Sequence, residues 1–249
     1  MASQRVVAWF SAGAASAVAA KLTLVQHGCD AVVVYIDTGS EHPDNARFIA
    51  DCERWFRQPV RRLKSERYRD TWQLWEERRF LIGPRGALCT AELKKVPRFD
   101  FQQPDDIQVF GYTVEEQARA DQFRRQNFDV RLSTPLIHAG LTKADCLAMI
   151  DRAGIEVPAM YRLGFQNNNC IGCVKGGMGY WNHIRRHFPE TFDRMSKLER
   201  QIGHSVCSER DGTPIWLDEL APDRGDVVSE PAFECSIFCH LAEQTLETA

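Results

Sequence analysis

The start of the chain holds two apolar runs, each followed by a polar turn and a helix-forming segment. Residues 6–10 predict a buried strand, and residues 11–16 form a loop of small residues. Residues 17–27 then predict an alanine-rich helix that Gly28 ends. Residues 31–36 predict a second buried strand. Two β-α units in succession imply a parallel sheet, which restricts the chain to α/β folds.

Later segments continue the same alternation. A helix is expected after Pro43, and Thr142 with Asp145 forms a capping box at the start of another. Further strands are expected at three short runs, residues 60–63, 107–110 and 130–132. We therefore expect an α/β fold with a doubly wound, mostly parallel, Rossmann-like sheet.

The C-terminal part of the chain has a different character. We expect residues 1–165 to form the α/β domain and residues 166–249 to form a small cysteine-rich region packed on it. A helix is predicted from Pro189 to Gly203. Residues 205–249 carry ten acidic and two basic residues, and we expect this stretch to be irregular. The rest of the chain is mildly basic, and its clusters, such as residues 61–64, either meet phosphates or lie on solvated faces.

The composition is that of an ordinary globular protein, with 44% hydrophobic and 26% charged residues and a net charge of −3. No apolar run approaches the roughly 18 residues that a membrane span requires. We therefore expect a cytoplasmic protein without a membrane partner, whose nine cysteines meet a reducing environment. Metal binding or thiol chemistry is favoured there over a disulfide framework.

The loop after the first strand has the composition of an anion-binding turn. Small residues let the backbone approach a ligand, and the N-terminus of the next helix offers N–H groups and a partial positive charge to a phosphate. Ser11 and Ser16 add hydroxyl donors. Asp37-Thr38-Gly39 follows the second strand, at the edge where open α/β sheets bind ligands. Such a loop also serves close packing of a helix on a sheet, so the loop alone does not decide between the two roles.

The stretch Cys170-Ile171-Gly172-Cys173 is the strongest metal-binding signal in the chain. Two cysteines three residues apart can hold one soft metal, and Gly172 permits the tight turn between them. A zinc ion or an iron–sulfur cluster needs four ligands, so the others must come from elsewhere. The thiol candidates are Cys89, Cys235 and Cys239, and the nitrogen candidates are His183, His187 and His240. The alternative interpretation is a pair of buried thiols.

The remaining cysteines have weaker signals. Cys52 and Cys146 fall on apolar helical faces, and Cys29 borders a predicted strand. At such positions a cysteine usually behaves as a small buried hydrophobic residue. Cys207 lies in a polar loop.

Several separated segments together form a set of motifs. Residues 11–16 resemble a Ser-Gly-Gly-x-Asp-Ser loop, and residues 37–39 match an Asp-Thr-Gly motif. Residues 158–173 resemble a run of Pro-Leu-Tyr, Gly-Tyr and Cys-x-x-Cys. Cys89 is followed by Lys94, Lys95 and Pro97, and Glu234-Cys235 is followed by His240. Over most of its length the chain thus resembles the PP-loop adenine-nucleotide α-hydrolases, and among them the phosphoadenosine-phosphosulfate (PAPS) and adenosine-phosphosulfate (APS) reductase family.

This resemblance implies the roles of individual residues. The implied nucleotide-binding residues are Ser11, Gly13, Ser16, Asp37, Thr38 and Gly39. The implied sources of positive charge at the substrate are Lys94, Lys95 and Arg119, and the alternative for the two lysines is a solvated helix face. Independently of the resemblance, Glu115 and Glu116 either cap or solvate a helix, or one of them orients Arg119. The implied ligands of a 4Fe-4S cluster, with zinc as the alternative, are Cys89, Cys170, Cys173 and Cys239. Cys235 is the implied nucleophile, and the fourth ligand stays open between Cys235 and Cys239.

The chain departs from the family pattern at three places. Ala12 and Ala15 stand where the loop pattern has a glycine and an aspartate, so the resemblance carries over no cation preference. Cys89 is single where the family has two adjacent cysteines. Residues 111–116 stand where the reductases tend to carry arginines that hold the sulfonucleotide. The nucleotide therefore stays open between ATP and PAPS or APS.

Three functions remain as hypotheses. In the first, the protein is an enzyme of the PAPS reductase family that performs sulfur chemistry on an adenine nucleotide, with a thiol or a protein as reductant or sulfur donor. In the second, it is an ATP-dependent sulfurtransferase that thiolates or phosphorothioates a nucleic acid, which the basic clusters mildly favour. In the third, it is a regulator that binds a nucleotide and a metal without catalysis. The oligomeric state does not follow from the sequence.

Overall fold

The computed structural model describes residues 4–84 and 86–230, and their contacts divide the chain into two compact units. Unit 1 comprises Met1–Asp37, Pro43–Lys64 and Pro97–Ala159. Unit 2 comprises Thr38–His42, Ser65–Val96 and Met160–Ala249. The boundary expected at residue 165 lies close to the last of these junctions. The sequence did not indicate, however, that two earlier segments group with the C-terminal part of the chain.

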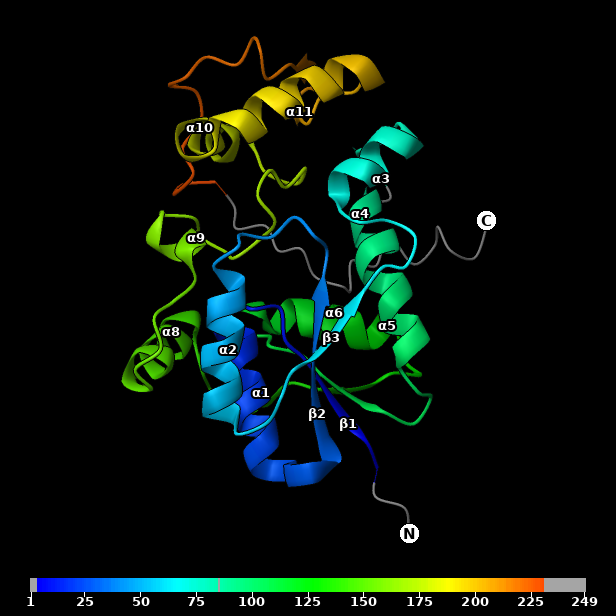
Figure 1. Ribbon diagram of the computed structural model, residues 1–249, viewed down its shortest axis with the longest axis vertical. Helices are drawn as coiled ribbons and strands as arrows, with labels where there is room; N and C mark the ends of the chain where they lie inside the picture. Colours follow the sequence, from blue (N-terminus) through cyan, green and yellow to red (C-terminus); the bar gives the residue numbers. More distant parts are fainter. Residues whose placement is uncertain (1–3, 85, 231–249) are drawn as a thin grey trace. The chain divides into compact units, whose positions relative to one another are not determined.

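Unit 1 contains a five-stranded parallel sheet in the order β3-β2-β1-β6-β7 (Figure 1). Its strands are β1 (Val6–Trp9), β2 (Ala31–Asp37), β3 (Arg61–Lys64), β6 (Ile107–Val109) and β7 (Arg131–Ser133). In the central strand β1, Val6 lies opposite Ala31 of β2 on one side and Ile107 of β6 on the other. The chain therefore changes direction across the sheet between β1 and β6, which is a topological switch point. All the predicted strands are confirmed.

Helices cover both faces of this sheet, which gives a Rossmann-like α/β arrangement. The helical segments are α1 (Ala14–His27), η1 (Gly28–Asp30), α2 (Asn45–Phe56), α5 (Val96–Phe101), η3 (Val114–Glu116), α6 (Gln117–Gln126), α7 (Pro135–His138) and α8 (Lys143–Arg152). The short helix α9 (Ala159–Arg162) begins at the last residue of unit 1 and continues into unit 2. α1 contacts α2, α7 and α8, and Figure 1 shows α1, α2 and α8 beside one another. Ala8 and Phe10 belong to the core on that side. Trp9 points to the opposite face, where its ring packs edge-on against the ring of Phe101 of α5, with ring centres 6.2 Å apart.

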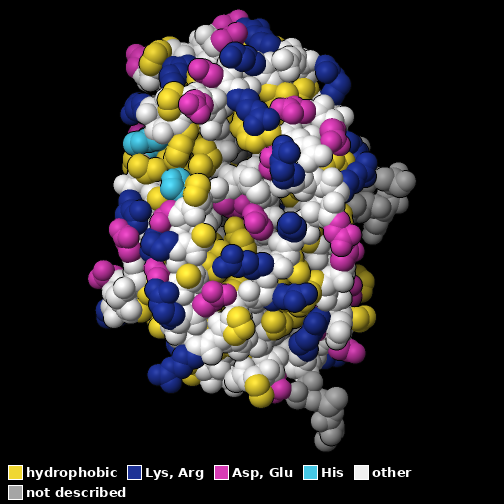
Figure 2. All heavy atoms as spheres, in the orientation of Figure 1, with side chains coloured by type: hydrophobic (Ala, Val, Ile, Leu, Met, Phe, Trp, Pro, Cys, Tyr) yellow, Lys and Arg dark blue, Asp and Glu magenta, His cyan; other side chains and the backbone are white. Residues whose placement is uncertain are grey.

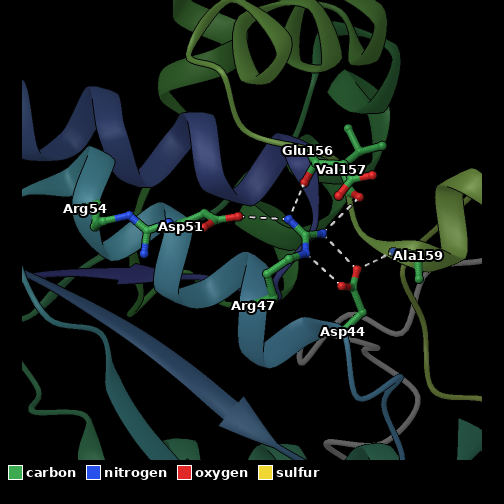
Figure 3. A network of polar contacts seen from close by, with 7 residues as sticks. All are labelled: Asp44, Arg47, Asp51, Arg54, Glu156, Val157 and Ala159. Atoms are coloured by element: carbon green, nitrogen blue, oxygen red, sulfur yellow. Dashed lines mark hydrogen bonds and ion pairs between the residues drawn. The ribbon is translucent and has the colours of Figure 1, made fainter.

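A polar network fixes the end of unit 1 that leads into residues 158–161 (Figure 3). Arg47 of α2 pairs with Asp44 at 2.7 Å and Asp51 at 2.8 Å, and it also donates to the carbonyl of Glu156 at 3.0 Å. Asp44 in turn accepts the N–H of Ala159 at 2.8 Å. These partners, with the Asp44 hydrogen bond first, raise the pKa of Arg47 above its usual value. The Arg47 side chain thus stays charged, and with Asp44 it holds residues 156–159 against the start of α2.

Unit 2 has its own apolar core, with the side chains of Trp75 and Trp181 fully buried. Its elements are α3 (Thr71–Arg78), β4 (Ile82–Gly83), β5 (Gly86–Ala87), α4 (Leu88–Thr90), the π-helical turn η2 (Ala91–Lys95), α10 (Met178–His187), α11 (Pro189–Ile202), β8 (Cys207–Ser208) and β9 (Pro214–Ile215). α10 packs against α11, and Gly203 is the C-cap of α11, in agreement with the predicted end of this helix. The described part of the tail, up to residue 230, consists mostly of turns and loops, as expected. β8 and β9 form a short antiparallel pair there, and Leu217 and Leu220 join the core.

Acidic and basic side chains are interspersed with apolar ones over the face shown in Figure 2. None of the helices described here combines the length and the apolar character that a membrane crossing requires.

Candidate functional site

The turn after β1 has a strained backbone. Ala12 has a φ of +57°, in the left-handed region, which costs a residue with a Cβ atom about 1–2 kcal/mol. Ala12 is also completely buried. Glycine adopts this conformation without strain, and the related motif carries glycine at this position. The chain therefore keeps a glycine-type turn although its own residue disfavours it, and strain of this kind concentrates at ligand-binding turns.

Ser16 closes the same turn through its hydroxyl group. The hydroxyl accepts the N–H of Ser11 at 3.1 Å and donates to the carbonyl of Gly13 at 3.0 Å. The Ser11 hydroxyl lies 3.0 Å from it. Sequence reasoning assigned Ser16 only to the phosphate, whereas the structure also gives it the role of shaping the loop.

The N-terminus of α1 opens directly from this turn. Gly13 is the N-cap and no side chain caps it, and the helical hydrogen bonds begin with the N–H of Ala17 donating to Gly13 at 3.0 Å. The N–H groups of residues 14–16 therefore lie outside the helical ladder, at the positive end of the helix dipole. This geometry suits a phosphate or another compact anion.

The loop that follows β6 packs tightly against the first turn of α1. A Cβ atom on Gly111 would lie 2.9 Å from the Cα and N atoms of Ser16 and 3.1 Å from the carbonyl carbon of Ala15. Only glycine allows two backbone segments to approach this closely. Since β1 and β6 flank the switch point, the two loops meet where open α/β sheets bind their ligands.

Arg119, at the start of α6, is held by two neighbours in unit 1. Its guanidinium group pairs with Glu116 and lies 5.5 Å from the centre of the Tyr112 ring. Glu116 therefore has both of the roles considered for it, because it pairs with Arg119 and its carboxylate also accepts the N–H of Thr113 at 3.2 Å in a capping box. Glu115 instead accepts the N–H of Lys143 at 3.1 Å. Its hydrogen bond with Thr113 is the main cause that lowers the pKa of Glu115.

The turn that follows β2 is shaped by two residues, one of which sequence reasoning missed. Gly39 has a φ of +70°, and a Cβ atom there would lie 2.2 Å from the carbonyl oxygen of Arg69. The carboxylate of Glu41 accepts the N–H groups of Thr38 at 3.2 Å and Ser40 at 3.3 Å. Asp37 is the exposed last residue of β2. A carboxylate two or three residues after a motif is a weak sequence signal, because many surface turns carry one.

This turn also holds the first cysteine of the Cys170–Cys173 stretch. The hydroxyl of Thr38 lies 3.0 Å from the sulfur of Cys170, and the carbonyl of Ser40 accepts the N–H of Ile171 at 2.9 Å. Thr38 and Cys170 are separated by 132 positions in the chain. The Asp-Thr-Gly motif therefore supports the cysteine loop directly, which the sequence did not indicate.

Cys170 and Cys173 lie at the two ends of one tight, buried turn. They are 6% and 4% exposed, and Gly172 between them has the expected positive φ, at +78°. The hydroxyl of Tyr180, on α10, accepts the N–H groups of Gly172 at 3.1 Å and Cys173 at 2.9 Å and donates to the carbonyl of Cys170 at 3.1 Å. Nothing in the sequence indicated this contact, since an aromatic residue on a helix is more often a packing residue. Burial raises the pKa of Tyr180 well above its usual value, so the hydroxyl keeps its proton.

Cys89, Lys94 and Lys95 lie on the continuous helical segment formed by α4 and η2, also in unit 2. Cys89 is 7% exposed and belongs to the same apolar core as Cys173. Lys95 is completely buried, so the alternative of a solvated helix face is wrong for this residue. Lys94 is half-buried. A π-helical turn is a frequent feature of functional sites, and a buried ammonium group needs anionic or polar partners.

A complete metal site is not assembled within residues 4–84 and 86–230, where no three His, Cys, Asp or Glu side chains are grouped to hold an ion. Cys235, Cys239 and His240 lie outside the described residues. Two buried thiols on one turn suit a soft metal such as zinc or iron in their chemistry. The pair therefore fits part of a ligand set for such a metal.

The other cysteines and histidines correct two expectations. Cys52 and Cys146 are buried as predicted, and burial raises the pKa of Cys146 to about 12. Cys29 is exposed rather than buried. Cys207 is buried on β8 rather than in a polar loop, and burial raises its pKa to about 12. His183 and His187 form a pair with ring centres 4.5 Å apart, in contact with the ring of Phe165.

No family model matches the chain. Over 209 residues it is 26% identical to an uncharacterized protein, MJ0066, of Methanocaldococcus jannaschii. The alignment covers 79% of this chain and 42% of that protein. The chain thus spans less than half the length of this relative, whose description names no activity.

Proposed function

We propose that the protein is an enzyme of the PP-loop, PAPS reductase type that binds an adenine nucleotide, ATP or PAPS/APS, in unit 1. It performs sulfur chemistry with a metal centre bound by cysteines, a 4Fe-4S cluster or alternatively zinc. The observation that carries the nucleotide part is the strained turn at Ala12 beside the open N-terminus of α1. This turn lies at the switch point of the sheet, where the Gly111 loop packs against it.

In this proposal the chain's own groups bind and orient the nucleotide. The N–H groups of residues 14–16 and the hydroxyl of Ser11 hold phosphate oxygens, and Asp37 lies at the adjacent strand end for the adenosine. Arg119, kept in place by Glu116, supplies positive charge from the β6 side of the switch point. Lys94 and Lys95 belong to unit 2 and supply positive charge on the segment that carries the proposed metal ligand Cys89.

Cys89, Cys170 and Cys173, with Cys239 from the tail, are the proposed ligands of the metal centre. A bound cluster would supply electrons or a site for sulfur. The hydroxyl of Thr38 lies 3.0 Å from the Cys170 sulfur, within hydrogen-bonding distance.

Cys235 is the proposed nucleophile for a sulfonucleotide. Its thiolate attacks the sulfur atom, a sulfur–sulfur bond forms, and the bond from that sulfur to the phosphate oxygen breaks. The nucleotide leaves with that oxygen and its electron pair. A dithiol reductant would then release sulfite and become a disulfide.

The nucleotide part is tested by a charge placed at the loop. Ser11 is exposed, and the Ser11→Glu variant adds a carboxylate where the phosphate is proposed to bind. An added carboxylate within about 5 Å of a phosphate costs on the order of 1–3 kcal/mol, so ATP and PAPS should bind at least about tenfold more weakly in calorimetry. The control is Gln26→Glu, which adds the same negative charge at the exposed far end of α1. Equal nucleotide affinities in the two variants would contradict the proposed binding site. A separate assay of the released product identifies the nucleotide, since pyrophosphate release indicates ATP and sulfite release indicates PAPS or APS.

One observation favours the second candidate, a sulfurtransferase that acts on nucleic acid. The edge strand β3 and the residue that ends α2 expose four cations, Arg57, Arg61, Arg62 and Lys64. Within the described parts of the chain none of these side chains forms an ion pair. Charges on an edge strand also prevent strand pairing, so exposure alone does not decide the role. Retention on single-stranded RNA or DNA during a salt gradient should fall in Arg61→Ser/Arg62→Ser and not in the control Arg125→Ser/Arg152→Ser.

A further inference from the structure

The hydroxyl of Tyr180 uses every hydrogen-bonding position that a phenol offers. A tyrosine hydroxyl has one proton to donate and two lone pairs to accept with. Here the proton goes to the carbonyl of Cys170, and the lone pairs take the N–H groups of Gly172 and Cys173. All three contacts lie in the turn that joins the two thiols, and all are buried. One side chain from outside the turn, that of Tyr180, thus binds three backbone groups of the turn.

The turn has little freedom to take another shape. A Cβ atom on Gly172 would lie 2.8 Å from the side chain of Thr191 and 3.4 Å from Trp181. Gly172 is therefore confined by unit 2 itself as well as by the hydroxyl of Tyr180. Leaving buried N–H groups without an acceptor is costly, so the turn and the tyrosine stabilise each other.

Tyr180 is itself fixed from two sides. Its ring packs edge-on against the rings of Phe165 and Trp181, with ring centres 5.6 Å and 5.7 Å apart. The carboxylate of Glu230 accepts the N–H groups of Gly179 and Tyr180 at the start of α10. The ring contacts orient the side chain, and the Glu230 contacts fix the backbone from which it projects.

We infer that Tyr180 is a positioning residue that builds the Cys170–Cys173 turn before any metal arrives, so that the two thiols are presented as a preformed pair. The role in metal binding rests on the proposed function. The preformed turn does not, because its hydrogen bonds are complete within the protein. Preorganisation of this kind reduces the ordering cost that binding a metal would otherwise carry.

The first experiment measures amide hydrogen exchange in wild-type protein purified without metal and kept under reducing conditions. The N–H groups of Gly172 and Cys173 should already be protected, at the level of the neighbouring core of unit 2, and addition of Co²⁺ should change this protection little. Rapid exchange of both amides in the metal-free protein, with protection appearing only after Co²⁺ binds, overturns the inference. This arm needs no variant, so it remains decisive if a variant does not fold.

The second experiment compares Tyr180→Phe with Tyr68→Phe. Tyr68 lies in the same apolar core and is 2% exposed, so both variants remove one buried hydroxyl from unit 2. In Tyr180→Phe, protection of Gly172 and Cys173 should be lost and Co²⁺ affinity, followed by the thiolate-to-cobalt absorption band, should fall about 10- to 100-fold. Tyr68→Phe should change neither. Unchanged exchange in a folded Tyr180→Phe protein overturns the inference, whereas wild-type protein that protects the amides but binds no Co²⁺ contradicts only the proposed metal centre.

Discussion

Replacement of Ala12 by glycine tests whether the turn after β1 is held in the strained shape described above. Relief of the left-handed conformation should stabilise the folded protein by about 1–2 kcal/mol. Loss of the buried methyl group costs about 0.8 kcal/mol, and the greater freedom of glycine in the unfolded chain costs about 0.4–1 kcal/mol. The three contributions nearly cancel, so Ala12→Gly should leave the free energy of unfolding within about 1 kcal/mol of the wild type.

The matched control is Ala17→Gly. Ala17 is also completely buried, but it lies inside α1, where its N–H donates to Gly13. Glycine there loses the same methyl group and about 1 kcal/mol of helix propensity without relieving any strain, so a loss of about 2 kcal/mol is expected. Urea denaturation followed by tryptophan fluorescence measures both variants. If Ala12→Gly is as destabilising as Ala17→Gly, residue 12 is not strained and the argument for a constrained anion-binding turn fails.

Three other predictions concern separate parts of the chain. Glu199 is completely buried, and burial raises its pKa to about 7 despite the N–H groups of Val206 and Leu217 that its carboxylate accepts. Because the pKa of Glu199 is higher in the folded protein than in the unfolded chain, the protonated side chain contributes its full stabilisation below about pH 4.5. This contribution is lost as the pH rises through about 7. At about 1.4 kcal/mol per pKa unit, the free energy of unfolding should fall by about 3 kcal/mol between pH 4.5 and pH 8. Denaturation measured at these two pH values should show this fall in the wild type and not in Glu199→Gln. Gly111→Ala should lower the unfolding free energy by about 1–3 kcal/mol and weaken nucleotide binding, since the new methyl group meets the backbone of α1; a stable variant with intact binding would show that the two loops separate easily. Cys173→Ser should lose bound metal in elemental analysis and show faster exchange across residues 166–180, and an unchanged metal content would count against the metal centre.

The strands of unit 1 and its helices α1, α2 and α8 could be predicted because their signals are local. The apolar runs that become β1 and β2 and the capping box of Thr142 and Asp145 on α8 depend on residues a few positions apart. Each segment therefore has one favoured structure before any long-range contact forms. The interleaved units were not predicted, because no periodicity shows that residues 65–96 pack with the C-terminal part of the chain.

The candidate site divides in the same way. The loop of residues 11–16, the Asp37-Thr38-Gly39 turn and the Cys170/Cys173 pair were recognised from short motifs. Ala12, Glu41 and Gly111 were not recognised as shaping residues, because a small residue or a single acid in a loop has many ordinary explanations. The prediction was wrong for Cys29 and Cys207, since burial of one cysteine depends on which segment covers it.

By itself, then, the order of apolar and polar residues determined a parallel α/β sheet with a small-residue turn after its first strand, because strand, turn and helix preferences act over a few residues. Only the tertiary structure decided that Thr38 meets the sulfur of Cys170, that Tyr180 anchors the turn between the two thiols and that Lys95 is buried. The physical reason is that these contacts join residues far apart in the sequence. They form only when the folded chain packs those segments against each other. Spacing along the chain carries no record of which distant groups will meet.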